Sequence, residues 1–184
     1  MKRLATIVLV GGLWPAVLNS QTFKVSPNPV SDTVRDMLTR GSTNLVASAD
    51  LMPVDKYAYH PTPQQMTFAE LIVHVTQTNL ALCSGISGTP SPLSADQLGK
   101  LSAADGKVSI VATLKQSFGY CTEALAKVDD SALALEVSMF GHPSHQSRGA
   151  MMIVLAADWA DHYSTAASYL RLNGILPPTA DPKR

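Results

Sequence analysis

Two side chains with metal-binding chemistry stand one helical turn apart near the end of the chain. Asp158 and His162 are four residues apart, so on a helix they lie on the same face. That face also carries residues that helices commonly bury, namely Met151, Leu155, Ala166 and Tyr169. Burying a carboxylate and an imidazole costs several kcal/mol unless both groups find partners, and a divalent metal ion suits both. The pattern therefore indicates either a metal site or a polar pair inside the fold.

A further imidazole belongs to a different segment. His74 joins an apolar helical face formed by Phe68, Leu71, Val75 and Leu82. Taken without any further information, His74 is better explained as a hydrogen-bonded core histidine, with Asp158 paired to it or to Arg148. Arg148 is also a candidate to receive an anionic group of a substrate. The residues alone therefore favour a structural polar cluster over a metal site.

Composition and motifs narrow the class of function. The 184 residues hold 14 basic and 14 acidic side chains and only 6% aromatics, so neither electrostatic attraction nor base stacking favours a nucleic-acid partner. The sequence contains no G-x-S-x-G, P-loop, dinucleotide-binding or H-E-x-x-H motif. We expect a small-molecule substrate or none.

Apolar periodicity predicts a helical protein. Long helices are expected at residues 31–49, 67–85, 108–128 and 144–173, with a short helix at 94–101. Thr67 and Glu70 form a capping box at the start of the second helix, and Gly174 ends the last one. Residues 131–143 alternate weakly, and no convincing strand is predicted there. Four amphipathic helices predict an all-α four-helix bundle.

The N-terminus has the pattern of a secretory signal peptide. Lys2 and Arg3 precede an apolar run from 4 to 18, which is too short for a comfortable membrane span. We predict a signal peptide at 1–20, a single domain at 21–184 and export to the periplasm or the extracellular space. No stable membrane insertion is expected after cleavage.

The two cysteines, Cys83 and Cys121, both fall inside predicted helices. Disulfides persist in exported proteins, so a bridge between them is a candidate. Two small buried hydrophobic residues are the alternative.

Three segments together resemble the DinB/YfiT family of metal-binding four-helix proteins. They are Phe68-Ala-Glu-Leu-Ile-Val-His74, the helix with Asp158 and His162, and the run from Tyr169 to Pro178. The similarity covers about residues 30 to 180 and implies an up-down-down-up topology. It also implies one divalent ion, most often zinc or nickel, held by His74, Asp158 and His162. The chain departs from the commonest family pattern because an aspartate replaces the first histidine of the last-helix pair.

The resemblance favours a metal site and leaves two classes of function open. The first is a metalloenzyme, either a hydrolase or a thiol transferase, whose loops near 85–105 and 131–145 select the substrate. The second is a non-catalytic module in which the metal stabilises the bundle or a dimer. The donor set of two histidines and one carboxylate also suits iron or manganese. Relatives that form dimers leave a homodimer open, although no apolar stripe is clearly left over for a partner.

Overall fold

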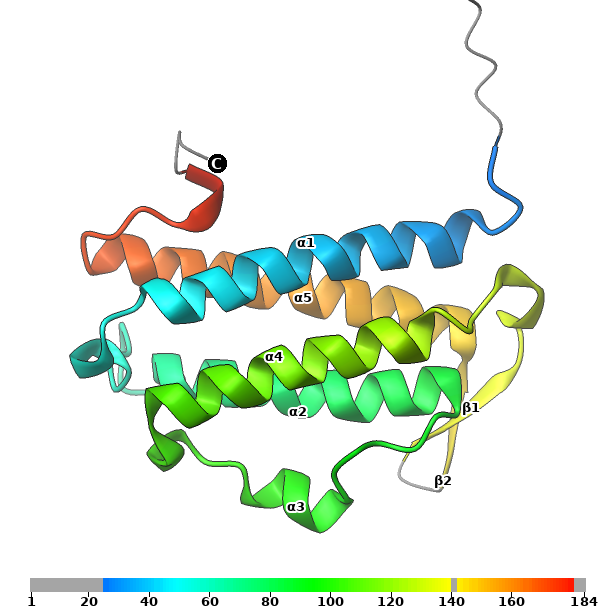
Figure 1. The fold of residues 1–184 in the computed structure, drawn as a ribbon, viewed down its shortest axis with the longest axis horizontal. Helices are drawn as coiled ribbons and strands as arrows, with labels where there is room; N and C mark the ends of the chain where they lie inside the picture. The colour runs from blue at the N-terminus through cyan, green and yellow to red at the C-terminus, as the bar shows by residue number, and fades with distance from the viewer. Residues whose placement is uncertain (1–24, 140–141, 181–184) are drawn as a thin grey trace, which may run out of the picture.

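The computed structural model describes residues 25–139 and 142–180 and contains four long helices (Figure 1). The long helices are α1 (Pro29–Leu51), α2 (Phe68–Ser87), α4 (Gly106–Leu125) and α5 (Arg148–Leu172). The short helix α3 (Ala95–Lys100) lies in the connection between α2 and α4. None of the helices in this described part has the length and apolarity that a membrane crossing requires. The predicted signal peptide lies outside the described residues.

The helices form an up-down-down-up bundle, as predicted. In Figure 1, α1 and α5 run in one direction, and α2 and α4 run in the other. Helix α1 packs against α4 and α5, and α2 packs against the same two helices. The α1–α4 and α2–α5 pairs therefore lie on opposite sides of the bundle. The long connection through α3 is needed because α2 and α4 are parallel.

Short sequence motifs determine where the helices begin and end. The side chain of Thr67 accepts a hydrogen bond from Glu70 N at 3.2 Å, and Glu70 Oε2 accepts one from Thr67 N at 2.7 Å, so the predicted capping box is present. Gly174, with φ of +74°, follows the end of α5. Helix α1 begins two residues earlier than predicted because Pro29 suits the first helical turn.

The segment between the last two long helices, in which the sequence indicated no convincing strand, contains two short strands. Residues Glu136–Met139 (β1) and His142–Ser147 (β2) pair as an antiparallel hairpin, and β1 packs against α2. Helix α5 consequently begins at Arg148 rather than near residue 144, with the Ser147 hydroxyl accepting a hydrogen bond from Ala150 N. Val137 is buried, so the weak alternation noted in the sequence reflects a short strand.

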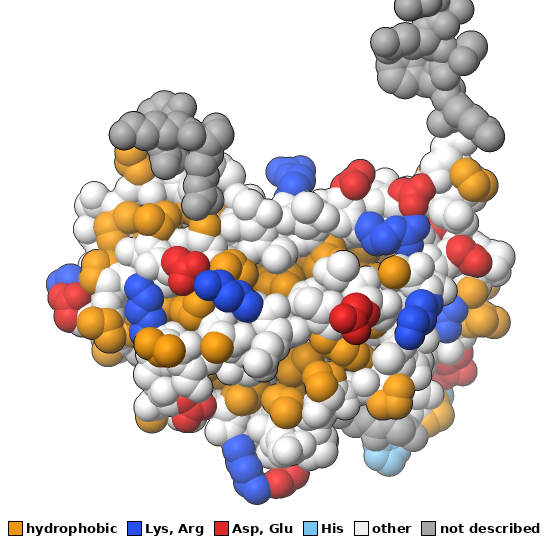
Figure 2. Space-filling view, viewed as in Figure 1, with side chains coloured by type: hydrophobic (Ala, Val, Ile, Leu, Met, Phe, Trp, Pro, Cys, Tyr) orange, Lys and Arg blue, Asp and Glu red, His pale blue; other side chains and the backbone are white. Residues whose placement is uncertain are grey.

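The core is apolar, and a disulfide within it links two of the helices. Cys83 of α2 and Cys121 of α4 form a disulfide, and both residues are fully buried. Trp159 of α5 fills the centre of the bundle, where Gly41 of α1 allows close approach. On the face shown in Figure 2, basic and acidic side chains are interspersed among apolar ones.

Candidate metal centre

Helix α2 positions the first candidate ligand. The capping box fixes the start of the helix at Phe68, and His74 follows less than two turns later. Leu71 and Val75 on neighbouring positions are buried, whereas His74 is half-buried at the border of the core. The helix therefore holds this imidazole between the apolar interior and the surface.

Helix α5 positions the other two. Asp158 and His162 have side chains that are 16% and 15% exposed, so both are largely withdrawn from water. Trp159, between them in sequence, points into the core and donates a hydrogen bond from Nε1 to Asn79 Oδ1 at 2.7 Å. This bond joins α5 to α2 and fixes the rotation of α5, which directs Asp158 and His162 toward His74.

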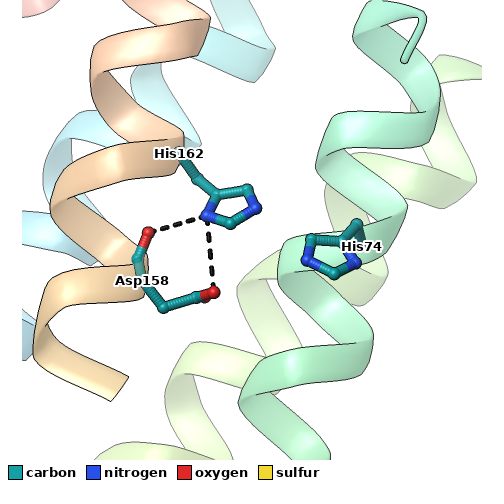
Figure 3. Close-up of side chains that lie close together, drawn as sticks. All are labelled: His74, Asp158 and His162. Carbon is teal, nitrogen blue, oxygen red and sulfur yellow. Dashed lines mark hydrogen bonds and ion pairs between the residues drawn. The ribbon is translucent and has the colours of Figure 1, made fainter. Parts of the chain in front are cut away.

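The three side chains converge between α2 and α5 (Figure 3). One ligand atom from each of His74, Asp158 and His162 lies within 4.8 Å of the other two. The two imidazole rings are stacked, with centroids 4.8 Å apart and an interplanar angle of 27°. Two ligands that are each roughly 2.1 Å from one ion can be at most about 4.2 Å apart. Closing around an ion therefore requires only a small side-chain adjustment.

A hydrogen bond made by the His162 ring determines which of its two nitrogens is free to bind a metal ion. Its Nδ1 lies 2.8 Å from the backbone oxygen of Asp158. Because a carbonyl oxygen only accepts, Nδ1 must carry the proton, and Nε2 keeps the free lone pair. In Figure 3 the Nε2 atom lies on the side of the ring nearer α2. Such a bond from the non-ligating nitrogen orients histidines in metal sites.

The carboxylate of Asp158 lacks the partners that its burial demands. Its Oδ2 is buried without a hydrogen-bond partner among the described residues. Its Oδ1 is 3.5 Å from His162 Nδ1, which is longer than an ordinary hydrogen bond. Burial raises the pKa of Asp158, and the nearby His162 and His74 only partly offset this effect. A divalent cation would satisfy both Oδ2 and the buried negative charge, so the residues present fit a metal ion.

The alternative polar pairing has less support. Asp158 makes no short hydrogen bond to either imidazole, and Arg148 stands ten residues earlier on α5, roughly 15 Å along the axis at 1.5 Å per residue. Arg148 is therefore not part of the cluster, and its own Nε is buried without a partner among the described residues. Glu70 serves the capping box, as its lowered pKa reflects: hydrogen bonds from the Thr67 backbone and hydroxyl favour the charged form.

Two hollows adjoin the cluster on the outer side of α2. One measures about 630 Å³ and the other about 420 Å³, and both are lined by His74 and Gln77. A separate hollow of about 930 Å³ lies between α1 and α4, on the opposite side of the bundle, and includes the Asp50–Lys115 ion pair at 3.2 Å. Among the described residues, His74 lines the first two hollows and not the third, whereas Asp158 and His162 line none of the three.

Sequence reasoning missed two residues near the site. Asn79 is the fully buried acceptor of the Trp159 hydrogen bond, and Gln77 donates from Nε2 to Leu98 O at 2.9 Å, which ties α3 to α2. The sequence signal that could have identified Asn79 is an amide side chain among the apolar residues on one face of a helix. Gln77, three residues after His74, falls on the same side of the helix.

Comparisons with known proteins agree on one family. The model of the DinB superfamily matches residues 37–166, more than half of the chain. A DinB-like protein from Bacillus cereus ATCC 10987 is 15% identical, with a TM-score of 0.64 over 80% of this chain and 95% of that one. A protein from Exiguobacterium sibiricum 255-15 assigned to the DinB family is 15% identical, with a TM-score of 0.60 over 81% of this chain and 95% of its own.

A third similar structure is that of an enzyme variant. A histidine-to-alanine variant of the mycothiol-dependent maleylpyruvate isomerase is 16% identical, with a TM-score of 0.55 over 73% of this chain and 59% of that one. Similarities at this level of identity establish the fold. No curated protein matches the chain.

Proposed function

Because the chain belongs to the DinB superfamily, we propose that it holds one divalent metal ion through His74, Asp158 and His162 and uses it on a small-molecule substrate. The observation that carries this proposal is the buried Oδ2 of Asp158, which has no hydrogen-bond partner in the described part of the chain and lies within reach of two imidazoles. A purely structural cluster would be expected to satisfy that oxygen with a donor from the protein.

The donor set suits several ions. Two histidine nitrogens and one carboxylate oxygen are common ligands of zinc, and the same set accommodates nickel, iron or manganese. Three protein ligands leave coordination positions free, which is the arrangement of catalytic rather than structural zinc sites. The two hollows lined by His74 offer space for a substrate next to one of the three ligands.

The proposed reaction is hydrolysis or transfer of a thiol. A bound divalent ion lowers the pKa of coordinated water or thiol and polarises a substrate carbonyl. The chain itself contributes orientation: the Asp158 carbonyl fixes the tautomer of His162, and Trp159 fixes the rotation of α5. Similarity to the fold of a mycothiol-dependent isomerase supports thiol chemistry as one of the two reactions.

Export of the protein is part of the proposal. The apolar N-terminal run follows the pattern of a signal peptide, and the Cys83–Cys121 disulfide suits an oxidising compartment. Low-molecular-weight thiols are mainly cytosolic, so an exported location favours the hydrolytic reaction over thiol transfer.

Metal content tests the proposal directly. The purified protein, saturated with zinc and desalted, is expected to retain one ion per chain by plasma mass spectrometry. His162→Ala removes one of three ligands, so the retained zinc should fall at least about tenfold. His60→Ala, which changes an exposed histidine outside the cluster of three ligands, is the matched control and should retain wild-type zinc. Equal zinc in wild type and His162→Ala would refute this ligand set.

A further inference from the structure

Helices α2 and α4 are joined twice at matching positions. The Cys83–Cys121 disulfide connects residues 38 positions apart, and the hydrogen bond from Asn79 Nδ2 to Ser117 Oγ, at 3.0 Å, connects residues that are also 38 positions apart. On each helix the hydrogen-bonded residue precedes the cysteine by four positions, so the two lie on one face. The separations match because the two helices run in the same direction (Figure 1). The disulfide therefore holds α2 and α4 in the register at which Asn79 meets Ser117.

The hydrogen bonds around Asn79 have a defined direction. The Ser117 hydroxyl donates to Leu114 O at 2.8 Å, so its oxygen accepts from Asn79 Nδ2. The amide of Asn79 thereby turns its Oδ1 toward α5, where the indole Nε1–H of Trp159, which can only donate, binds it at 2.7 Å. Asn79, Ser117 and Trp159 are all buried from water. The position of Ser117 thus determines the orientation of the amide that holds Trp159.

The disulfide lies directly against this network. Cys121 Sγ is 3.3 Å from Asn79 O, and both cysteines are fully buried. The disulfide is one helical turn, roughly 5.4 Å, from the bond between Asn79 and Ser117. A covalent link at that distance opposes any sliding of α2 along α4 that would separate Asn79 Nδ2 from Ser117 Oγ. A hydrogen bond is a much weaker restraint by itself, because folding only exchanges it for hydrogen bonds to water.

The network ends at the candidate metal centre. Trp159 directly follows Asp158 in the sequence and precedes His162 by three residues, so the rotation that Trp159 gives to α5 also directs both ligands. His74 lies five residues before Asn79 on α2, roughly 7.5 Å along the axis at 1.5 Å per residue. The ligand atoms now lie within 4.8 Å of one another, and one ion requires no more than about 4.2 Å. A modest rotation of α5 relative to α2 would therefore open the set too far for an ion.

From these contacts we propose that the disulfide between α2 and α4 is a positioning element of the metal centre. By holding Ser117 against Asn79, it keeps Trp159 and the ligands of α5 directed toward His74, so the protein binds its metal ion more tightly with the disulfide than without it. The inference rests on the proposed function, because it assigns the disulfide a role in that same site. It also makes complete assembly of the metal centre depend on a compartment in which the disulfide forms.

Removing the disulfide tests the proposal. Competition with a chelator would compare the zinc affinity of the oxidised wild type with that of the double variant Cys83→Ala/Cys121→Ala, under conditions in which both are fully folded. The double variant is expected to bind zinc at least about threefold more weakly, as is typical of changes that act on a site through intervening contacts. Val34→Ala, which removes apolar contacts from the buried core on α1 outside the network, is the matched control and should keep wild-type affinity.

A further set of variants tests whether the effect passes through Asn79. Asn79→Ala should itself weaken zinc binding, and removal of the disulfide from the Asn79→Ala protein should then cause little further loss, because residues of one network are not additive. Losses that simply add would overturn the proposed path. If the variant without the disulfide fails to fold, Ser117→Ala takes its place, since it removes the hydrogen bond to Asn79 and leaves the disulfide intact. Wild-type zinc affinity in Ser117→Ala would overturn the proposal.

The outcomes separate the disulfide from the metal. If the wild type binds zinc and the folded double variant binds it equally well, the role of the disulfide is overturned and the metal centre stands. If the wild type binds no zinc, the metal centre fails instead, and NMR of the metal-free protein tests the positioning. Shifted signals of Trp159 Nε1–H and of the His74 and His162 rings in the double variant, with unshifted signals in Val34→Ala, would support it. Unshifted signals in both variants would overturn it.

Discussion

Two polar clusters involve neighbouring residues of α2 and α5, and one of them also includes α4; they differ in how completely their atoms are paired. The closed cluster consists of Asn79, Ser117 and Trp159. Trp159 Nε1 donates to Asn79 Oδ1 at 2.7 Å, and Asn79 Nδ2 donates to Ser117 Oγ at 3.0 Å. The open cluster consists of His74, Asp158 and His162, where Asp158 Oδ2 has no partner among the described residues.

The difference indicates what each cluster does. Every polar side-chain group of the closed cluster is used within the protein, as expected for a network that specifies how helices pack. Among the described residues, the open cluster leaves Asp158 Oδ2 and the Nε2 lone pair of His162 without a hydrogen-bond partner, as expected for a site that binds a ligand. Since Asp158 and Trp159 are consecutive residues, the closed cluster also sets the direction of the open one.

The same contrast holds for two carboxylates. Burial acts to raise the pKa of Asp130, but hydrogen bonds from Ser31 Oγ and from the backbone N–H groups of Val30 and Ser31 outweigh it, and the pKa is lowered. Burial of Asp158 raises its pKa because no comparable set of donors surrounds it. Asp130 is thus a paired structural carboxylate, whereas Asp158 has only a long 3.5 Å contact from Oδ1 to His162 Nδ1 and no partner for Oδ2 among the described residues.

The disulfide beside the closed cluster should give the largest loss of stability. Replacing both Cys83 and Cys121 by Ala opens a link across a sequence separation of 38 residues, which is expected to lower the free energy of unfolding by about 2–4 kcal/mol. Urea denaturation of the double variant and of the oxidised wild type measures the difference. A change within error would show that the bridge adds nothing to the packing of α2 on α4.

Breaking the closed cluster itself should cost somewhat less. Asn79→Ala leaves Trp159 Nε1 buried without an acceptor, which is expected to lower the free energy of unfolding by about 1–3 kcal/mol. Asn44→Ala, at a part-exposed position of α1, is the matched control and should cost less than about 0.5 kcal/mol. Equal losses in the two variants would contradict a special role for the closed cluster.

Removing the paired carboxylate of Asp130 should give a smaller loss of stability, and this loss should depend on pH. Because the pKa of Asp130 is lowered by folding, its contribution is present above the unfolded-state pKa of about 3.9 and is lost as the pH falls through the folded value. Asp130→Asn should therefore lower Tm by a few degrees at pH 7, and the gap should narrow below about pH 4. Asp36→Asn, an exposed change in α1, should show no such gap. A gap independent of pH would contradict the assignment.

Replacing Asp158, whose Oδ2 lacks a partner among the described residues, should not lower the stability of the metal-free protein. Asp158→Asn removes a buried charge whose Oδ2 has no donor among the described residues, so the unfolding temperature of the metal-free protein should be unchanged or slightly raised. Zinc affinity, measured by competition with a chelator, should fall at least about tenfold. The control, Asp161→Asn, alters an exposed position one turn along α5 and should keep wild-type affinity. A clear loss of metal-free stability in Asp158→Asn alone would indicate a structural role instead.

The four long helices were predictable because their signals are local. The capping box at Thr67, the stop at Gly174 and the apolar spacing within each helix all lie in short stretches of sequence. The hairpin was not predictable in the same way, since its only signal was a weak alternation around Val137 and its pairing depends on α2 packing behind it.

The candidate site also has a part that local sequence predicts and a part that depends on tertiary contacts. The pairing of Asp158 with His162 follows from helical spacing alone, whereas the residues left the partner of Asp158 open between His74 and Arg148, and only the resemblance to a family implied that His74 joins both as a metal ligand. The hydrogen bond between Asn79 and Trp159 joins residues 80 positions apart, and helical periodicity contains no information about such contacts.

A crystal structure of the zinc-loaded protein, with anomalous scattering recorded at the zinc absorption edge, tests the central claim most directly. The expected result is one anomalous peak at about 2.0–2.2 Å from His162 Nε2, a nitrogen of His74 and an oxygen of Asp158. No peak between α2 and α5, or a peak only at exposed histidines such as His142 and His145, would contradict it.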